Sequence, residues 1–352
     1  MAGDRFQICP LLVLRPARPV CRQAGGRQVP PTPSLSRQSR EPDTLHKSVI
    51  GYLLKPTLLI LLVLIPSTVA WVEDRPRVVV TLPVLKDFAE VIGGDRVEVK
   101  SLLTGLESEH TYTPKPTDIL AVKEAHLLVK IGLALESWVD QLIKNAGNTH
   151  LLIITTADGV PLLKDASNHT KNQSESFKDR HTMGNPHIWL DPVNAKIMLR
   201  HIVEGLIKID PQGKEIYLKN FANYIKKLDQ LEEQGKKKVK ALPDRRIVTH
   251  HAAWPYFARR FGLIIEGNLI NQVGSEPSAK ELARLTRKIK REGIKVIVSE
   301  PQLNPNLPQM MAQETGARVV VLTPLPGAIP GTETYLSMIE YDINQLVKAL
   351  KE

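Results

Sequence analysis

Three histidines in polar loops are the residues of this chain most suited to holding a metal ion. They are His110 after a predicted strand at 97–103, His187 after a long polar stretch, and His251 after a predicted strand at 246–249. Neutral imidazole is a ligand suited to zinc and other late divalent ions. Loops beyond the carboxyl ends of strands are also where α/β folds bind ligands. These positions therefore predict a site for a divalent metal ion.

Spacing alone does not separate these three residues from the other histidines. A single histidine in a loop is more often hydrogen-bonded or solvent-exposed than metal-bound, and His150 has the same setting. His126 and His201 lie in predicted regular elements, which favours packing or surface roles. His250 adjoins His251 and is the alternative ligand at that position.

The elements that must position these residues alternate between strands and helices. Short β-branched runs are followed by segments with helical periodicity, and this order predicts an α/β fold with mainly parallel sheets. The predicted strands are at 77–82, 97–103, 126–131, 151–156, 246–249, 263–265, 296–299 and 319–322. The predicted helices include 135–143, a helix opening near Thr117, and 278–291, which Ser278 and Glu281 begin with a capping box.

A long helix divides the two halves of this pattern. Between 211 and about 240 one stripe of apolar residues recurs at helical spacing, and Lys and Glu fill the other faces. The stripe consists of Tyr217, Phe221, Tyr224, Leu228 and Leu231. We therefore predict an amino-terminal lobe at 71–210, a linking helix at 211–243, a carboxy-terminal lobe at 244–352, and a ligand cleft between the lobes.

Composition excludes two other kinds of protein. The formal net charge of +10 could indicate nucleic-acid binding, but residues 1–70 hold nine basic and three acidic residues, and the rest holds 38 and 34. So small a surplus, without a nucleic-acid motif, indicates an ordinary solvated surface, and no nucleic-acid partner is expected. Cys9 and Cys21 both precede residue 47, which excludes a disulfide scaffold or a cysteine metal site from the folded part.

The first 70 residues indicate export. Residues 1–46 are rich in Arg, Pro, Ser and Gln, and they are either a disordered leader or translation from an upstream start. Residues 47–70 combine a basic stretch, an apolar run and small residues ending at Ala70, which is the pattern of a signal peptide. The apolar run is shorter than the roughly 20 residues of a membrane span, which favours a cleaved signal peptide. An uncleaved membrane anchor is the alternative.

From about Arg77 to its end, the sequence resembles the solute-binding proteins of zinc/manganese ABC transporters, the cluster A-I metal-binding family. Five phrases carry the resemblance in order: Ser108-Glu-His-Thr-Tyr-Thr-Pro-Lys-Pro-Thr-Asp118, Gly132-Leu-Ala-Leu-Glu-Ser-Trp138, Asn185-Pro-His-Ile-Trp-Leu-Asp-Pro192, His251-Ala-Ala-Trp-Pro-Tyr256 and Glu276-Pro-Ser278. The resemblance implies two α/β lobes joined by a long backbone helix, with a metal ion held in the cleft between them.

Carried over position by position, the resemblance implies that His110, His187 and His251 are the metal ligands. Manganese-type members supply a fourth, acidic ligand after the last strand, where this chain has Thr323 and Pro324. Manganese prefers oxygen-rich sites of higher coordination number, whereas three imidazoles with water or one carboxylate suit zinc. The missing carboxylate therefore favours Zn²⁺ over Mn²⁺ or Fe²⁺ as the transported ion.

Other polar residues near these phrases admit two interpretations. Glu109 is predicted as the fourth ligand, with Glu300 or water as alternatives. Asp191 could orient His187, but its place before Pro192 favours a helix N-cap. The polar stretch at 164–186, with two histidines, is predicted to be a mobile surface loop, and it resembles a weak form of the histidine-rich loop of zinc-type members.

The expected function is extracytoplasmic capture of a divalent ion, most simply zinc, and its delivery to an ABC transporter permease in the inner membrane. The protein is expected to be a monomer of the periplasm or cell envelope, and not an enzyme. A manganese or iron carrier and a surface adhesin on the same fold are the alternatives. A zinc hydrolase is disfavoured because the chain has no His-Glu-x-x-His pair.

Overall fold

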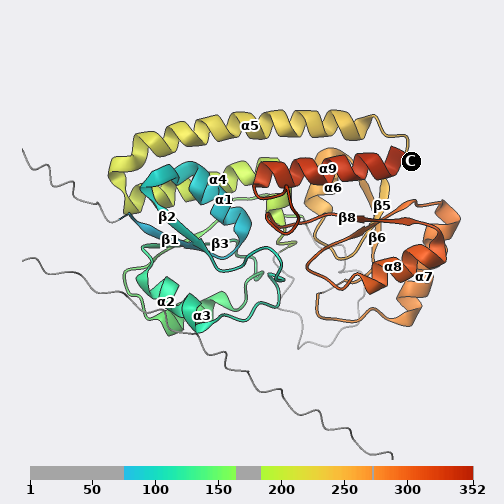
Figure 1. The fold of residues 1–352 in the computed structure, drawn as a ribbon, viewed down its shortest axis with the longest axis horizontal. Coiled ribbons are helices and arrows are strands. Elements are labelled where there is room, and N and C mark those ends of the chain that lie inside the picture. Colours follow the sequence, from blue (N-terminus) through green and yellow to red (C-terminus); the bar gives the residue numbers. More distant parts are fainter. Residues whose placement is uncertain (1–74, 164–183, 272, 352) are drawn as a thin grey trace, which may run out of the picture. The chain divides into compact units, whose positions relative to one another are not determined.

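A computed structural model describes residues 75–163, 184–271 and 273–351 of the protein. The predicted leader at 1–46, the predicted signal peptide at 47–70 and most of the polar loop at 164–186 lie outside these residues. Within the described ranges no helix has the length and apolar character needed to cross a membrane. The predicted α/β class is confirmed, because two four-stranded parallel sheets form the centres of two lobes (Figure 1).

The first sheet is built from short strands in the order β2-β1-β3-β4, all parallel. Its strands are β1 (Arg77–Val80), β2 (Glu98–Ser101), β3 (Leu127–Lys130) and β4 (Leu152–Thr155). The two central strands are almost fully buried, as expected where helices cover both faces of a parallel sheet. The helices are α1 (Pro83–Gly93), α2 (Pro116–Glu124), α3 (Val139–Ala146) and α4 (Pro192–Ile209).

The second sheet has the corresponding order, β6-β5-β7-β8, and is also parallel. Its strands are β5 (Arg246–Thr249), β6 (Ile264–Asn268), β7 (Val296–Ser299) and β8 (Arg318–Val321). The helices are α6 (Pro255–Phe261), α7 (Ala279–Glu292), α8 (Asn306–Thr315) and α9 (Tyr335–Lys351). Alternate residues of the strands face opposite sides, so Val248 and Ile297 pack in a small cluster with α7 and α8, while Ile247 belongs to the main core.

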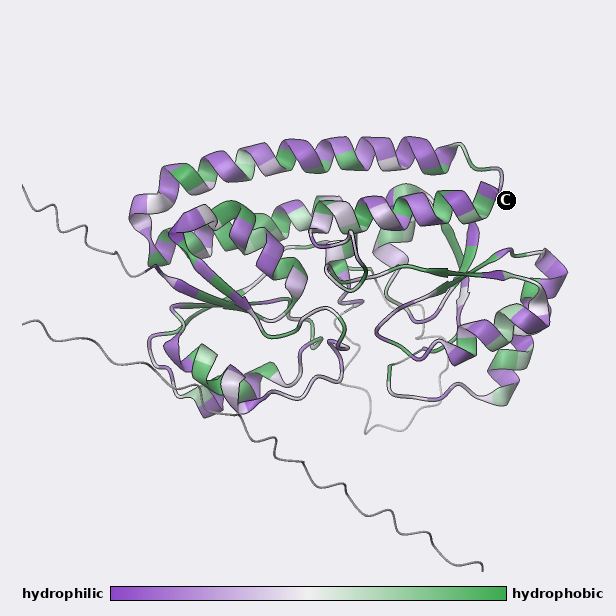
Figure 2. Cartoon of the chain, viewed as in Figure 1, coloured by the Kyte–Doolittle hydropathy of each residue, from purple (hydrophilic) through white to green (hydrophobic). Residues whose placement is uncertain are grey.

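The long helix α5 (Lys214–Lys240) has 27 residues and is therefore about 40 Å long. It packs against α1 and α4 of the first lobe and against α6 and α9 (Figure 1). Figure 2 shows it as mostly hydrophilic, with interspersed hydrophobic positions. Of the predicted stripe, Tyr217, Tyr224 and Leu228 are buried, and Phe221 and Leu231 are half-buried against the core. The prediction of one apolar stripe is confirmed.

The final helix also contacts the first lobe. Tyr335, the first residue of α9, is fully buried, and its ring lies 4.9 Å from that of Phe88 in an edge-on contact. Its backbone N–H donates to Asp87 Oδ2 at 3.1 Å, and its hydroxyl donates to the carbonyl of Trp189 at 2.7 Å. The cores of the two lobes are thus continuous through this residue.

One predicted helix begins later than expected. The helix expected at 135–143 spans Val139–Ala146, because residues 133–138 form consecutive turns, in which Leu133 and Ala134 have φ angles of 57° and 58°. Such angles are uncommon for residues other than glycine, so they could not be anticipated from these residue types. The capping box at Ser278 is confirmed, because its side chain accepts from the backbone N–H of Glu281.

Candidate metal centre

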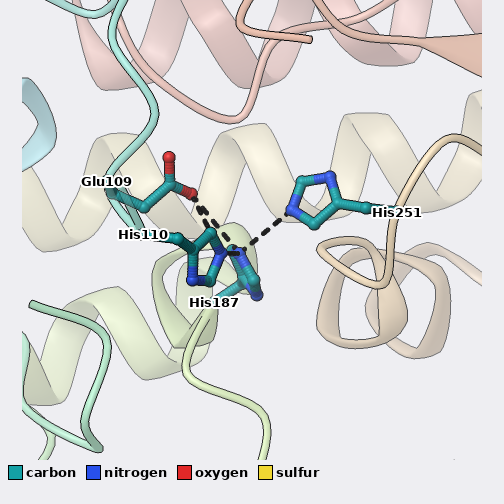
Figure 3. A group of neighbouring side chains, drawn as sticks. All are labelled: Glu109, His110, His187 and His251. Carbon is teal, nitrogen blue, oxygen red and sulfur yellow. Dashed lines mark hydrogen bonds and ion pairs between the residues drawn. The ribbon is translucent and has the colours of Figure 1, made fainter. Parts of the chain in front are cut away.

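Four side chains converge where the loops of the two lobes meet: Glu109, His110, His187 and His251 (Figure 3). Each offers one ligand atom, and these atoms all lie within 4.8 Å of one another. Glu109 and His110 lie in the loop after β2, His187 directly precedes the short helix η4 (Ile188–Leu190), and His251 lies two residues after β5. All four predicted site residues are therefore brought together.

Four of the six distances among these atoms are close to the edges of a tetrahedron around a zinc ion, and all six are within 4.8 Å. His187 Nε2 lies 3.2 Å from His110 Nε2 and 3.3 Å from His251 Nε2. Glu109 Oε1 lies 3.4 Å from His187 Nε2 and 3.8 Å from His110 Nε2. Four ligands about 2.0–2.1 Å from a tetrahedral zinc ion stand about 3.3–3.4 Å apart. Small movements of these side chains would bring all four atoms to zinc–ligand distance from one ion.

The carboxylate of Glu109 is poised in its charged form. The residue is 2% exposed, and Oε1 is buried beside the imidazoles without a hydrogen bond of good geometry to any described residue. Burial acts to raise its pKa, but the contact with His187 and the positive charge available on the three histidines lower it to about 2. Burial lowers the pKa of His187 in turn, although Glu109 opposes this effect. The centre therefore combines a negative oxygen with a readily neutral imidazole, as a divalent cation requires.

Asn185 orients His187. Its Oδ1 accepts from the backbone N–H of His187 at 3.0 Å and lies 3.1 Å from His187 Nδ1. If Nδ1 carries the hydrogen, Nε2 presents its lone pair to the centre. The Asn185 Nδ2 group donates to the carbonyl of Ala252 at 2.6 Å, next to His251. Asn185 thus connects two of the histidines, a role that was not predicted from the sequence.

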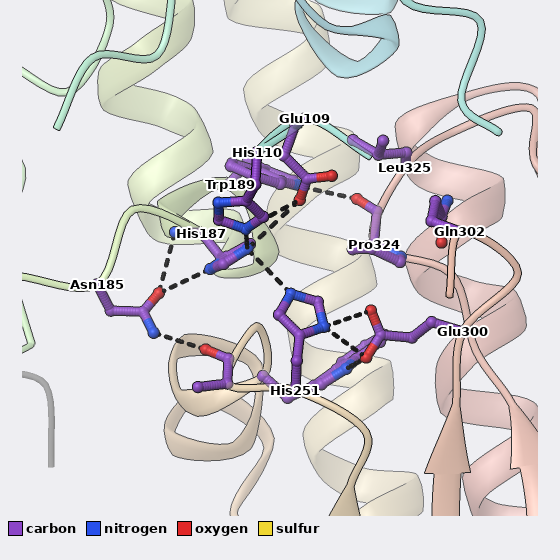
Figure 4. Close-up of polar contacts among 12 residues, drawn as sticks. Glu109, His110, Asn185, His187, Trp189, His251, Glu300, Gln302, Pro324 and Leu325 are labelled. Atoms are coloured by element: carbon purple, nitrogen blue, oxygen red, sulfur yellow. Dashed lines mark hydrogen bonds and ion pairs between the residues drawn. The ribbon is translucent and has the colours of Figure 1, made fainter. Parts of the chain in front are cut away.

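Glu300 orients His251 from behind (Figure 4). Its Oε1 and Oε2 lie 2.9 and 2.8 Å from His251 Nδ1, and Trp254 Nε1 donates to Oε1 at 3.1 Å. Burial acts to lower the pKa of His251, but the charge and hydrogen bond of Glu300 outweigh burial and raise it. Glu300 contacts the nitrogen that faces away from the centre, so it stands outside the group of four.

The remaining histidines within the described residues lie apart from this group. His126 Nδ1 accepts from the backbone N–H of Arg77 at 3.0 Å, and His201 Nε2 lies 2.8 Å from the carbonyl of Asp158. His250 is 3% exposed, and burial lowers its pKa. His169 and His181 lie outside the described residues.

The segment after β8 contributes no carboxylate to the centre. Thr323 is fully buried, and its hydroxyl donates to the carbonyl of Leu325 at 2.7 Å. The carbonyl of Pro324 accepts from Trp189 Nε1 at 2.7 Å. Trp189 in turn stacks at a tilt against His187, with 5.3 Å between ring centroids. The segment therefore supports the site by packing.

Asp191 is the predicted N-cap of α4, since its Oδ1 accepts from the backbone N–H of Val193 at 2.9 Å. It also forms a two-bond ion pair with Arg260 of α6, at 2.6 and 2.9 Å. The side chain of Asp191 is fully buried in this pair. The cap is confirmed, and the ion pair joins the start of α4 to the second lobe.

The centre opens into a cavity of about 830 Å³. His110, His187 and His251 line it, whereas Glu109 lies behind them. The side chain of His110 is 25% exposed, compared with 3% for Glu109 and 4% for His187. An ion could therefore enter from the cavity past His110 and meet the carboxylate last.

This fold and site define a two-lobed α/β binding protein with a histidine-rich centre between the lobes. The chain belongs to the family described as zinc-uptake complex component A, periplasmic, which matches residues 78–349. The resemblance inferred from the sequence is therefore confirmed. The family consists of transport components and not of enzymes.

Individual relatives support the same conclusion. The high-affinity zinc uptake system protein ZnuA of Bacillus subtilis (strain 168) is 31% identical over 258 residues, covering 72% of this chain and 80% of that protein. A crystal structure of ZnuA matches with a TM-score of 0.69 and 30% identity, covering 78% of this chain and 99% of that one. The laminin-binding protein Lmb of Streptococcus agalactiae, described as bifunctional with adhesin and metal-transporting activity, matches with a TM-score of 0.68 and 27% identity, over 78% and 100% of the two chains.

Proposed function

We propose that this chain binds one zinc ion through Glu109, His110, His187 and His251 and delivers it to an ABC transporter permease. The observation that carries the proposal is the spacing of the four ligand atoms, 3.2 to 3.8 Å along the measured edges. The ion is cargo, so no bond of a substrate is made or broken. Binding consists of replacing protons and water by zinc within a preformed centre.

The donor set supports zinc over the alternative ions. Three imidazole nitrogens and one carboxylate oxygen make a compact four-coordinate site, which zinc accepts readily. Manganese favours more oxygen ligands and a higher coordination number. Glu300 is engaged with His251 Nδ1, and Thr323 offers no carboxylate. The relatives described as zinc-uptake proteins point to the same ion.

The proposal includes the setting of the protein. We infer that residues 47–70 direct export, that 71–210 and 244–352 act as two lobes joined through 211–243, and that the monomer works outside the cytoplasm without a nucleic-acid partner. Sequencing the amino terminus of the exported protein distinguishes cleavage after Ala70 from an uncleaved anchor. In an uncleaved protein, the same measurement also shows whether residues 1–46 are made.

The ligand assignment is tested by competition between the purified full chain and a zinc-binding dye. His187→Ala should weaken zinc binding at least a hundredfold, because it removes one of four ligands. His250→Ala is the matched control, since His250 is equally buried, adjoins His251 and lies outside the group. Equal losses in both variants, or a loss in the control alone, would refute the assignment.

The ion assignment has its own test. Elemental analysis of the protein as purified, followed by competition between zinc and manganese, should give one zinc per chain and a strong preference for zinc. Manganese bound in preference to zinc would overturn the ion while leaving the four ligands in place.

A second function is suggested by the likeness to the laminin-binding protein of Streptococcus agalactiae. Deleting the gene should slow growth when zinc is chelated, and added zinc should restore growth. Unimpaired growth together with lost attachment to a laminin-coated surface would favour the adhesin instead.

A further inference from the structure

The loop that carries Glu109 and His110 is anchored at both ends in the first lobe, and Tyr112 donates to Asp118 Oδ2 at 2.7 Å after the two ligands. Between β2 and α2 it contains no helix or strand. Thr104 and Glu107 close it locally, through hydrogen bonds of 2.7 and 2.8 Å to Glu107 Oε2. Farther along, Trp138 Nε1 donates to the carbonyl of Glu109 at 3.1 Å. These contacts lie on either side of Gly105, whose carbonyl faces the second lobe.

Gln302 of the second lobe supplies such a contact. Its Nε2 donates to the carbonyl of Gly105 at 2.6 Å, between residues 197 positions apart. Gly105 has a φ angle of +108°, and a Cβ added there would lie 2.5 Å from the carbonyl oxygen of Pro326. Only glycine allows the backbone to approach the second lobe so closely at this point.

The amide of Gln302 is itself held by a buried framework. Its Nε2 also lies 3.3 Å from Thr323 Oγ1, and the backbone N–H of Thr323 donates to Asp342 Oδ1 at 3.0 Å. Thr323 and Asp342 are both fully buried. Buried residues of the second lobe therefore hold the Gln302 amide in place, and the amide in turn contacts Gly105.

One turn thus contacts both halves of the metal centre. The backbone N–H of Leu303 donates to the carbonyl of Glu300 at 3.2 Å, which closes a turn over 300–303. Within it, Glu300 holds His251, and Gln302 holds the loop of Glu109 and His110. Contacts with this turn therefore help to fix the distance between Glu109 and His110 of the first lobe and His251 of the second.

The side-chain oxygen of Gln302, Oε1, lies in an unfavourable environment. Oε1 is buried and has no hydrogen-bond partner within the described part of the chain. An unsatisfied buried oxygen is unfavourable, whereas an apolar side chain of similar length would avoid that cost. The amide cannot be turned over, because Oε1 would then face the carbonyl oxygen of Gly105.

We infer that Gln302 is a positioning residue for the metal centre, which sets the place of Glu109 and His110 relative to His251. The inference rests on the proposed zinc function. Gln302 touches no ion; it acts through the Gly105 carbonyl and the loop that follows. Its loss should impair metal binding more than it impairs folding.

The experiment compares zinc affinity and thermal stability of the full chain with Gln302→Met. Zinc binding should weaken about three- to tenfold, as expected for one lost hydrogen bond. The unfolding midpoint of the metal-free protein should move by less than about 2 °C, because the unsatisfied Oε1 is lost together with the bond. Gln309→Met on the exposed side of α8 is the matched control and should change neither quantity.

A double-mutant cycle separates positioning from a general effect. In a Glu109→Gln background, Gln302→Met should reduce affinity by a smaller factor than in the wild type, because part of what it positions is already lost. The zinc X-ray absorption spectrum of Gln302→Met should show fewer nitrogen and oxygen atoms at about 2.0–2.2 Å from the zinc ion. If Gln302→Met fails to fold, Gln302→Asn keeps the amide but is too short to reach Gly105, and it should show the same loss.

Unchanged affinity in Gln302→Met, or the same factor in both backgrounds, would overturn the inference. Wild-type protein that fails to bind zinc would instead refute the proposed function, so the two failures are distinct.

Discussion

Replacing Glu300 with glutamine is expected to weaken zinc binding about tenfold at neutral pH. The two carboxylate oxygens lie 2.9 and 2.8 Å from His251 Nδ1. Glutamine keeps the size and one acceptor oxygen, so the change removes mainly the negative charge. A hydrogen bond to a charged group is worth about 1 to 1.5 kcal/mol more than a neutral one, which corresponds to roughly tenfold in affinity. Losses of this size are typical for carboxylates that orient a metal-binding histidine.

The same substitution should alter the dependence of binding on pH. Burial acts to lower the pKa of His251, but Glu300 outweighs burial and raises it. A proton competes with zinc for this imidazole, so wild-type binding weakens as the pH falls through the raised pKa. Without the charge, burial dominates, the pKa drops, and the loss begins at a lower pH. The difference in zinc affinity between the wild type and Glu300→Gln should therefore become smaller as the pH falls.

The assay is competition with a zinc-binding dye at several pH values from about 5.5 to about 8, across the ordinary histidine pKa. Glu314→Gln is the control, because Glu314 is an exposed glutamate of α8 in a surface pair with Lys290 at 3.6 Å. An unchanged dissociation constant at neutral pH would refute the role of the charge. A ratio between variant and wild type that stays constant over the pH range would refute the coupling to protonation.

Three further substitutions test other contacts. Asn185→Ala removes the acceptor beside His187 Nδ1 and should weaken zinc binding about tenfold in the same dye assay, with an unchanged constant counting against it. Arg260→Met removes the two-bond partner of the buried Asp191 carboxylate and leaves only the contact of 3.5 Å with Arg259, so it should lower the free energy of unfolding in urea by about 3 kcal/mol; a loss below about 1 kcal/mol would contradict this expectation. Burial raises the pKa of Asp342 well above its usual value, so the folded state retains a proton that the unfolded state releases, and stability is lost as the pH rises. Asp342→Asn should therefore gain stability over the wild type between about pH 4 and about pH 8, and a constant difference in urea unfolding would refute the assignment.

Most strands were predictable because they are short apolar runs rich in β-branched residues, although β6 continues to Asn268, beyond the predicted 263–265. The observed β5 and β7 coincide with the predicted 246–249 and 296–299, since polar residues or turns bound both runs. The start of α3 was not predictable, because Leu133 and Ala134 give no sign of positive φ angles. Tertiary contacts impose such angles, and a local pattern does not contain them.

The metal centre was only partly visible in the sequence. Imidazole chemistry and the flanking phrases singled out His110, His187 and His251, which the structure brings together with Glu109. The supporting residues were harder to recognise. Gln302 contacts Gly105 across 197 positions, and nothing in the local sequence of either residue indicates the other.

The contact of the last helix with the first lobe bears on how the chain reaches its native state. Tyr335 is joined to Asp87 across 248 positions. During synthesis from the amino end, the first lobe must wait for the residues after 334 before its core can close, although its own strands are made early. Contacts so distant in sequence slow folding, because a long loop must be closed before they stabilise the chain. For the export proposed above, slow closure of this core would leave the chain unfolded for longer, in a state able to pass through a membrane.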